Sequence, residues 1–268
     1  MSWLGLIRAE FTFVYADIFR RKSLLFMLVA YPYMITAFIL LFGASIGTAQ
    51  EFIRKVGVDP VPFLIVSSFM IMSIIGVVDD ILWRPIYDEH MGTMPYVISA
   101  PTSRVAHYMA IPLPRLTLVV LIGSTSVIPV LTYYYSYAGL RESLIIMGLG
   151  ALGAVLFTTL AMVIVGLLFA VAEESWRVLN VIRPLLLVLL GAFYPRFLMP
   201  LYIRAVSWAL PPSHVVEAIQ RLLMGYGGLE VMLTLIGIAT ALFVLYAPLG
   251  SRAITLWEGR KVLKGVKT

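Results

Sequence analysis

The chain of 268 residues contains no cysteine, and only 13% of its residues are charged, whereas 61% are apolar. Without cysteine it has no disulfide, no thiolate metal ligand and no cysteine nucleophile. Soluble proteins average about 25% charged and about 45–50% apolar residues, and the mean hydropathy here is +0.96. This composition excludes an ordinary cytosolic globule, a disordered chain and a nucleic-acid-binding domain. Residues 1–268 suit a single membrane domain with the lipid bilayer as partner.

Motifs that carry chemistry are also missing. No G-x-x-x-x-G-K-[ST], H-E-x-x-H or G-x-S-x-G is present, and the three histidines, His90, His107 and His214, show no metal-ligand spacing. Gly148–Gly153 matches G-x-G-x-x-G, but it lies inside a long apolar run, which favours close helix packing over dinucleotide binding. The sequence therefore predicts no catalytic residue, no metal site and no cofactor on this chain.

The apolar residues fall into six runs that reach or approach the roughly 20 residues needed to cross a bilayer. The runs are Ser23–Gly47, Val61–Leu82, His107–Tyr134, Ser143–Ala172, Val178–Phe193 and Leu229–Leu249. The fifth is short, at about 24 Å against a hydrocarbon core of about 30 Å. The prediction is an all-α polytopic membrane protein with six transmembrane helices.

Residues 1–22 have the spacing of an amphipathic helix. The predicted apolar face holds Trp3, Leu4, Ile7, Phe11, Val14, Tyr15 and Ile18, and the polar face holds Arg8, Glu10, Thr12 and Asp17. The pattern favours an interfacial helix on the membrane surface over a helix packed against another protein surface.

Residues 83–107 form the largest predicted cytoplasmic connection, and they carry only modest charge. A short helix ending before Ala100-Pro101 would carry an apolar stripe of Ile86, Met91, Met94, Val97 and Ile98. Such a stripe fits a second helix lying on lipid as well as it fits a helix that docks into a groove of a cytosolic partner.

Residues 194–228 are apolar but interrupted by prolines, and they predict a helical hairpin on the outer side of the membrane. Two short helices fit the segment, around Leu201–Leu210 and Ser213–Met224, with Ser213 as an N-cap. Irregular backbone does not face lipid, so this hairpin is expected to lie at the interface or to be packed against the other spans.

Lysine and arginine set the predicted orientation. With six spans, 14 of them fall on the side that holds both termini and 6 on the other side. Basic residues collect in cytoplasmic loops, so we expect a multi-pass protein of the cell (plasma) membrane with both termini in the cytoplasm.

Asp79 and Asp80 lie near the cytoplasmic end of the second run, with Arg84 one helical turn beyond Asp80. A solvated cap or an ion pair is as good an interpretation as a proton or cation site. A magnesium–diphosphate site is disfavoured because the sequence has no second acidic cluster.

The order of these features resembles the permease subunit of the type-2 ABC exporter family. Asp88–Thr93 is similar to the family's acidic-x-x-Gly-Thr coupling segment, although Pro95 departs from its usual uninterrupted helix. The stretches that add to the resemblance are Ser99–Arg104, Gly191–Pro195, Met199-Pro200, Leu210-Pro211 and Glu217–Arg221.

The resemblance implies a membrane-spanning exporter subunit that pairs with a second copy of itself or a related permease, and with a cytosolic ABC ATPase that holds ATP and Mg. The implied coupling residues are Asp88, Glu89, Met91, Gly92, Thr93 and Met94, in a coupling helix centred on Glu89–Met94. The first and fifth spans would form the dimer seam, and the first, second and fifth would line the path. The implied outer gate, in a re-entrant hairpin, comprises Tyr194, Pro195, Pro200, Glu217 and Arg221, and Glu217 and Arg221 are spaced to pair.

Tyr31, Tyr33 and Phe38 are candidates for an aromatic lining of the path, although plain helix packing suits them better. The substrate stays open among amphipathic drugs, lipids and glycans. The alternative function is an ion-coupled secondary transporter or channel that uses Asp79 or Asp80 and needs no ATPase. The absence of a second half resembling the first argues against that alternative.

Overall fold

The computed structural model describes residues 3–43, 49–171 and 175–264. Three predicted segments lie partly outside these residues: the N-terminal helix at positions 1–2, the first run at 44–47 and the fourth run at Ala172.

The described chain is helical throughout. Its elements are α1 (Trp3–Arg20), α2 (Lys22–Gly43), α3 (Ala49–Val56), α4 (Pro60–His90), α5 (Met94–Ser99), α6 (Arg104–Ala110), α7 (Leu113–Val171), α8 (Ser175–Leu190), the 3₁₀ helix η1 (Arg196–Leu198), α9 (Leu201–Ser207), α10 (Pro211–Leu223) and α11 (Leu229–Lys264). The predicted all-α class is therefore confirmed.

Three helical stretches are long and apolar enough to cross a bilayer, namely Pro60–His90, Arg104–Val171 and Leu229–Val262. The most apolar part of the first is 89% buried inside the protein, whereas that of the third is only 11% buried. An apolar helix that is not covered by protein needs lipid around it. These helices are compatible with a membrane-embedded protein whose centre is α4.

Helix α7 is folded back on itself and supplies two antiparallel helices. Ser136 breaks it with a φ of 54°, and a Cβ on Gly139 would lie 2.1 Å from the carbonyl oxygen of Leu131. Gly123 and Gly150 both abut the ring of Phe69 on α4, although in a straight helix these two positions would be about 40 Å apart. The two halves correspond to the third and fourth predicted spans.

Glycines bring the central helices into close contact. Gly166 meets the backbone of Ala253 on α11, and Gly153 meets Ile74 and Val215. Within the predicted Gly148–Gly153 stretch, Gly150 and Gly153 therefore pack closely against neighbouring helices, as small residues do between membrane helices, whereas a Cβ on Gly148 would meet open space.

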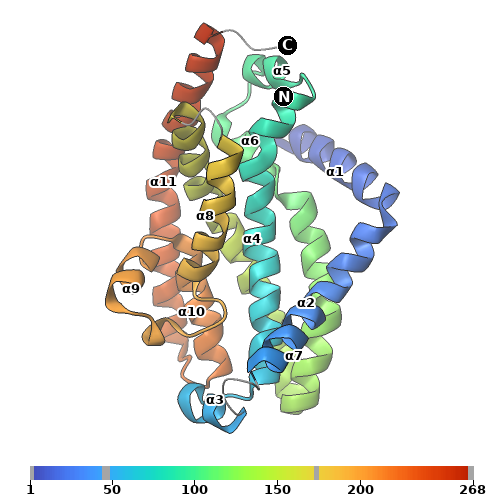
Figure 1. The fold of residues 1–268 in the computed structure, drawn as a ribbon, viewed down its shortest axis with the longest axis vertical. Helices are drawn as coiled ribbons and strands as arrows, with labels where there is room; N and C mark the ends of the chain where they lie inside the picture. Colours follow the sequence, from blue (N-terminus) through green and yellow to red (C-terminus); the bar gives the residue numbers. More distant parts are fainter. Residues whose placement is uncertain (1–2, 44–48, 172–174, 265–268) are drawn as a thin grey trace.

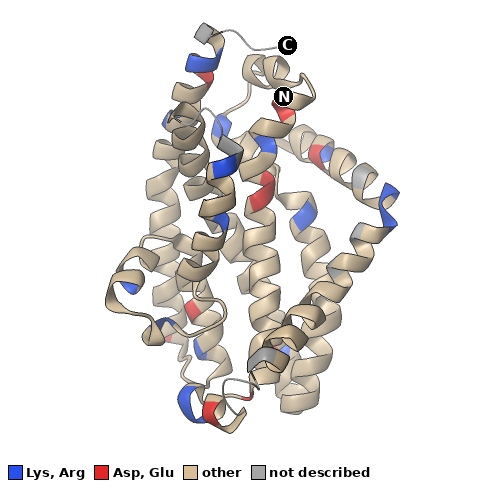
Figure 2. Cartoon of the chain, in the orientation of Figure 1, with Lys and Arg blue, Asp and Glu red and all other residues tan. Residues whose placement is uncertain are grey.

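Figure 1 shows α4, both halves of α7 and α11 running along the long axis, with α2 crossing them obliquely and α8 beside α4. Helix α5 and the last turns of α11 lie at one end, which we call the α5 end. Helix α3 and the fold of α7 lie at the opposite end, the α3 end, and the η1–α9–α10 segment lies toward it. Lys, Arg, Asp and Glu are sparse along the middle of the bundle (Figure 2).

Candidate functional site

A cavity of about 460 Å³ opens between α2, α4, α7 and α8. It is mostly apolar, and its volume falls in the range of ordinary ligand pockets, about 300–1,000 Å³. Its lining residues are Met27, Tyr31, Ile71, Met72, Ile75, Gly76, Asp79, Arg115, Val119, Arg183, Pro184 and Leu187. We call it the central cavity.

Of the three aromatic residues predicted to line a path, Tyr31 faces the central cavity. The hydroxyl of Tyr33 instead donates a hydrogen bond to the carbonyl oxygen of Thr125, at 2.8 Å, and neither Tyr33 nor Phe38 is among the lining residues. The packing alternative therefore describes Tyr33.

Three charged residues line the central cavity, Asp79, Arg115 and Arg183, and both arginines are in ion pairs. Arg183 pairs with Asp79 through Nη2 and Oδ2, and Arg115 Nη1 lies 2.7 Å from Asp80 Oδ1. Arg115 also donates to the carbonyl oxygen of Gly76 at 3.2 Å. Of the interpretations of Asp79 and Asp80, the ion pair is the one observed, but the partners are Arg183 and Arg115 rather than Arg84.

Neither pair uses its full hydrogen-bonding capacity. Asp79 Oδ1 and Asp80 Oδ2 are buried without a hydrogen-bond partner, and within the described chain they are the only buried carboxylate oxygens of this kind. The Arg183 side chain, by contrast, is 50% exposed. A buried charged oxygen without a donor costs free energy that a ligand can recover.

A second cavity of about 180 Å³ is lined by residues of α1, α4 and the start of α7. Phe13, Asp80, Trp83 and Arg84 line it, and Arg115 borders both cavities. Asp79 thus lines the central cavity and Asp80 the second one.

The predicted coupling helix over Glu89–Met94 is not formed as such. Helix α4 continues to His90, Gly92 turns the chain with a φ of 67°, and the short helix α5 begins at Met94. Pro95 occupies the first turn of α5, where a missing N–H costs nothing, so it starts the helix rather than bending it. The helix ends before Ala100 as expected.

The turn is held by Asp88, which is buried. Its Oδ1 accepts a hydrogen bond from the Thr93 hydroxyl at 2.8 Å, and its carbonyl oxygen accepts one from the Thr93 amide at 2.9 Å. Asp88 and Thr93 therefore fix the shape of the turn, while Glu89 pairs with Lys261 of α11 at 2.8 Å.

Most of the predicted apolar stripe is covered, but Met91 is exposed. Met94 is buried, and Ile86 and Ile98 pack against the core. The exposed apolar groups near the turn include Met91, Tyr96 of α5 and Tyr87 of α4.

Helix α1 departs from the predicted two-sided pattern at Glu10. This residue was assigned to the polar face, yet it is buried and accepts two hydrogen bonds from Arg84 of α4, at 3.0 and 3.1 Å. Arg84 also donates to Asp88 at 3.0 Å, so one guanidinium ties α1 to the turn before α5. Helix α1 is thus packed on the protein along this face.

Arg104 secures the opposite side of the same region. It pairs with the buried Glu258 of α11 at 2.8 Å and donates to the carbonyl oxygens of Val97 and Ile98 at the end of α5. The α5 end is therefore braced by both α1 and α11.

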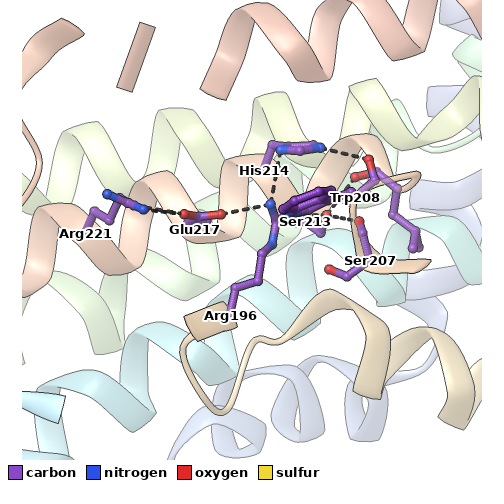
Figure 3. A network of polar contacts seen from close by, with 8 residues as sticks. Arg196, Ser207, Trp208, Ser213, His214, Glu217 and Arg221 are labelled. Atoms are coloured by element: carbon purple, nitrogen blue, oxygen red, sulfur yellow. Dashed lines mark hydrogen bonds and ion pairs between the residues drawn. The ribbon is translucent and has the colours of Figure 1, made fainter. Parts of the chain in front are cut away.

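The segment at the other end is organised by a buried polar network (Figure 3). Arg196 Nη1 lies 2.8 Å from Glu217 Oε2, and Arg221 Nη2 lies 2.7 Å from Glu217 Oε1, so the expected Glu217–Arg221 pair is confirmed. Arg196 also donates to the Ser213 hydroxyl at 2.6 Å. Helix α10 begins at Pro211, so Ser213 lies inside the helix rather than capping it as predicted.

His214 completes the network as a neutral ring. Its Nε2 donates to the carbonyl oxygen of Trp208 at 2.9 Å, and its Nδ1 accepts from Arg196 at 3.2 Å. Burial lowers the pKa of His214, and the neighbouring Arg196 lowers it further. The histidine is held in the form that accepts a hydrogen bond from the arginine.

The other predicted gate residues shape the loops around this network. The Tyr194 hydroxyl donates to the carbonyl oxygen of Val188 at 3.0 Å. Pro195 precedes η1, and Pro200 precedes α9. Gln220 of α10 donates to the carbonyl oxygens of Gly191 and Ala192, which fixes the segment to the end of α8.

Sequence reasoning missed Arg115, Arg183 and Arg196 as site residues. Each was counted only as a topological charge, although an arginine in an apolar helix is itself a sign of a buried partner or a site. Comparisons of the chain with protein-family models, curated proteins and solved structures find no match.

Proposed function

We propose that this chain is the membrane-spanning subunit of an ATP-driven exporter of the type-2 ABC class. In this proposal a separate ATPase supplies ATP hydrolysis, and two permease chains work together. The substrate is amphipathic, a lipid or a glycan, and the chain itself has no catalytic residue. The observation that supports it most is the central cavity, because α2, α4 and α8 supply three of its walls. These helices correspond to the first, second and fifth spans that the resemblance assigns to the path.

The proposed topology has six spans in the plasma membrane, formed by α2, α4, the two halves of α7, α8 and α11. The α5 end faces the cytoplasm, and the η1–α9–α10 segment is the outer gate. Two exposed tyrosines mark the two ends, Tyr96 of α5 and Tyr137 beside the fold of α7.

The natural absence of cysteine allows a direct test of this topology. Tyr96→Cys and Tyr137→Cys each place a single thiol in the chain. In intact cells, a membrane-impermeant maleimide should label the Tyr137→Cys thiol and not that of Tyr96→Cys, and permeabilisation should expose both. Labelling of Tyr96→Cys in intact cells would show that the orientation is the reverse of the proposed one.

The proposed ATPase contact comprises the exposed part of the turn, Met91, Gly92, Thr93 and Tyr96, next to Glu89. Exposed apolar side chains on a firmly braced turn suit a helix-in-groove contact. Asp88 and Met94 would act beneath this surface, because both are buried.

A pull-down from the native membrane tests the function. The tagged chain should bring with it an ATPase that contains a P-loop, at one copy per permease copy. Tyr96→Asp should lose the ATPase, whereas the matched change Tyr137→Asp at the other end should retain it. A chain that purifies alone as a stable oligomer would contradict the proposal.

An ion-coupled secondary transporter is the second candidate function. The observation that favours it is the pair of unpartnered oxygens on Asp79 and Asp80, because intramembrane carboxylates commonly serve ion pathways. Transport by the purified chain in vesicles with a proton or sodium gradient and no ATPase would establish this alternative and overturn the exporter proposal.

A further inference from the structure

The ion pairs of the central cavity differ from the other buried ion pairs of the described chain. The carboxylates of Glu10, Asp88 and Glu258 have no buried oxygen without a partner, whereas Asp79 and Asp80 have one each. Arg183 can donate further hydrogen bonds to a ligand, because its guanidinium carries five N–H groups and half of its side chain is exposed. The cavity thus offers an unused acceptor beside unused donors.

The charges at the polar end of the cavity sum to zero once Asp80 is included: Asp79, Arg115 and Arg183 line the cavity, and Asp80, which lines the second cavity, pairs with Arg115. An isolated anion near Arg183 would meet the carboxylate of Asp79, and an isolated cation near Asp79 would meet Arg183. A headgroup that carries both charges can satisfy both partners at once. Rotation of the Asp79 carboxylate about χ2, a soft torsion, turns Oδ1 toward the cavity that its side chain lines.

The polar groups lie at one end of the cavity on every helix that supplies them. On α4, Asp79 is nearer the α5 end, and Ile75, Met72 and Ile71 follow over about 12 Å. On α7 the order from the same end is Arg115 and then Val119.

Helix α8 repeats this order, with Arg183 before Leu187. Helix α2 adds apolar contact through Met27 and one aromatic ring through Tyr31. A headgroup at the polar end would therefore direct a hydrocarbon tail away from the α5 end, along the apolar walls.

We propose that the central cavity binds a zwitterionic amphiphile, with its ammonium group on Asp79, its phosphate on Arg183 and its tail along Ile71, Met72, Ile75 and Leu187. This inference rests on the proposed function as a transport subunit and names its substrate class. An exported amphiphile and a resident bilayer lipid share this chemistry.

Binding to the purified chain in a neutral maltoside detergent tests the proposal without any ATPase. The probes are three lauroyl or dodecyl amphiphiles: lysophosphatidylethanolamine, lysophosphatidic acid and dodecylammonium. We expect the zwitterionic probe to bind at least about tenfold more tightly than either singly charged probe, the size of effect given by one satisfied charged contact. Equal affinity for all three probes, or tighter binding of a singly charged one, would overturn the proposal.

Two substitutions should shift this selectivity in opposite directions. Asp79→Asn should weaken binding of the zwitterionic probe about tenfold and leave binding of lysophosphatidic acid unchanged or tighter. Arg183→Gln should weaken binding of both phosphate-bearing probes and strengthen binding of dodecylammonium relative to them. Loss of all three probes to the same extent in both variants would show a merely structural role and would also overturn the proposal.

Control variants keep the test decisive. Arg252→Gln and Glu230→Gln remove exposed charges of α11, away from the cavity lining, and should leave all affinities unchanged. Leu187→Trp fills the apolar part of the cavity without touching a charge, and it should abolish binding of the zwitterionic probe. Unchanged binding in Leu187→Trp would place the probe elsewhere.

Reconstitution with the ATPase separates the two sources of the ligand. ATP-dependent transfer of labelled lysophosphatidylethanolamine out of the inner leaflet identifies it as cargo, and ATP-independent retention identifies a resident lipid; either result keeps the binding site. A chain that binds the probe but recruits no ATPase would contradict the proposed function alone. A chain that recruits the ATPase but does not prefer the zwitterion would contradict this inference alone.

Discussion

Arg84 and Arg183 both pair with aspartates near the C-terminal end of α4, but their surroundings differ. Arg84 is 17% exposed and bridges two buried carboxylates with its full fork. Arg183 is 50% exposed and pairs with one oxygen of Asp79, while the other oxygen has no partner. The first arrangement fits a structural brace, and the second has capacity left for a ligand.

The largest effect should follow from loss of the Arg84 fork. Arg84→Ala leaves Glu10 and Asp88 buried without their cation, which typically costs about 3–5 kcal/mol of unfolding free energy. Thermal or denaturant unfolding in detergent measures the loss. Arg84→Lys, which keeps the charge but not the fork, should lose less. Equal stability of Arg84→Ala and the wild type would mean that the brace has no structural role.

Acid should weaken the polar network around Arg196 and His214 next. The folded pKa of His214 is lowered by burial, whereas the unfolded value is about 6.5. The unfolded chain therefore binds the additional proton first, and stability should fall as the pH drops below about 6.5, by up to about 1.4 kcal/mol per pH unit.

Unfolding midpoints between pH 7.5 and 5 measure this loss. His214→Gln should make the profile less steep, and the exposed His90→Gln should not. A profile that His214→Gln leaves unchanged would assign the acid sensitivity to another group.

Asp79→Asn should have a smaller effect on stability, below about 1 kcal/mol, because the released Arg183 can reach solvent. The same change should alter ligand binding strongly, which is the reverse of the pattern expected for Arg84. Unfolding and probe binding are measured on the same preparation. A stability loss as large as that of Arg84→Ala would remove the distinction between brace and site.

The Glu89–Lys261 pair should contribute least. Both side chains are partly exposed, and such pairs contribute about 0–1 kcal/mol. Lys261→Gln should therefore leave the unfolding midpoint nearly unchanged.

Glu89→Arg should instead impair ATPase-driven transport, because Glu89 lies next to the proposed ATPase contact. Intact coupled transport in Glu89→Arg would exclude Glu89 from the ATPase contact.

The long apolar helices were predictable because their signal is local. The central part of α4, both halves of α7 and most of α11 follow from runs of apolar residues, and the end of α5 follows from Ala100-Pro101. The close packing of Gly150 and Gly153 was also predictable, since the glycines lie inside an apolar run.

The Glu217–Arg221 pair was predictable because its residues are four apart on one helix, whereas the ion pairs that join residues far apart in sequence were not. Glu10 looks solvent-facing in its own helix and is buried only because Arg84 arrives from α4. Asp79 and Arg183 meet across two separate helices. Ser213 has the type and position of an N-cap, but α10 begins two residues earlier and Arg196 takes the hydroxyl.

Phe69 lies against Gly123 and Gly150 at once, so it joins α4 to both halves of α7 in one closely packed block. Helices α2 and α8 lie outside that block and show many exposed apolar side chains. The central cavity is therefore bounded on one side by the packed block and on the other by two helices whose apolar faces are largely uncovered by protein. Because lipid favours such uncovered apolar faces, an amphiphile could reach the cavity sideways from the bilayer as well as along the bundle.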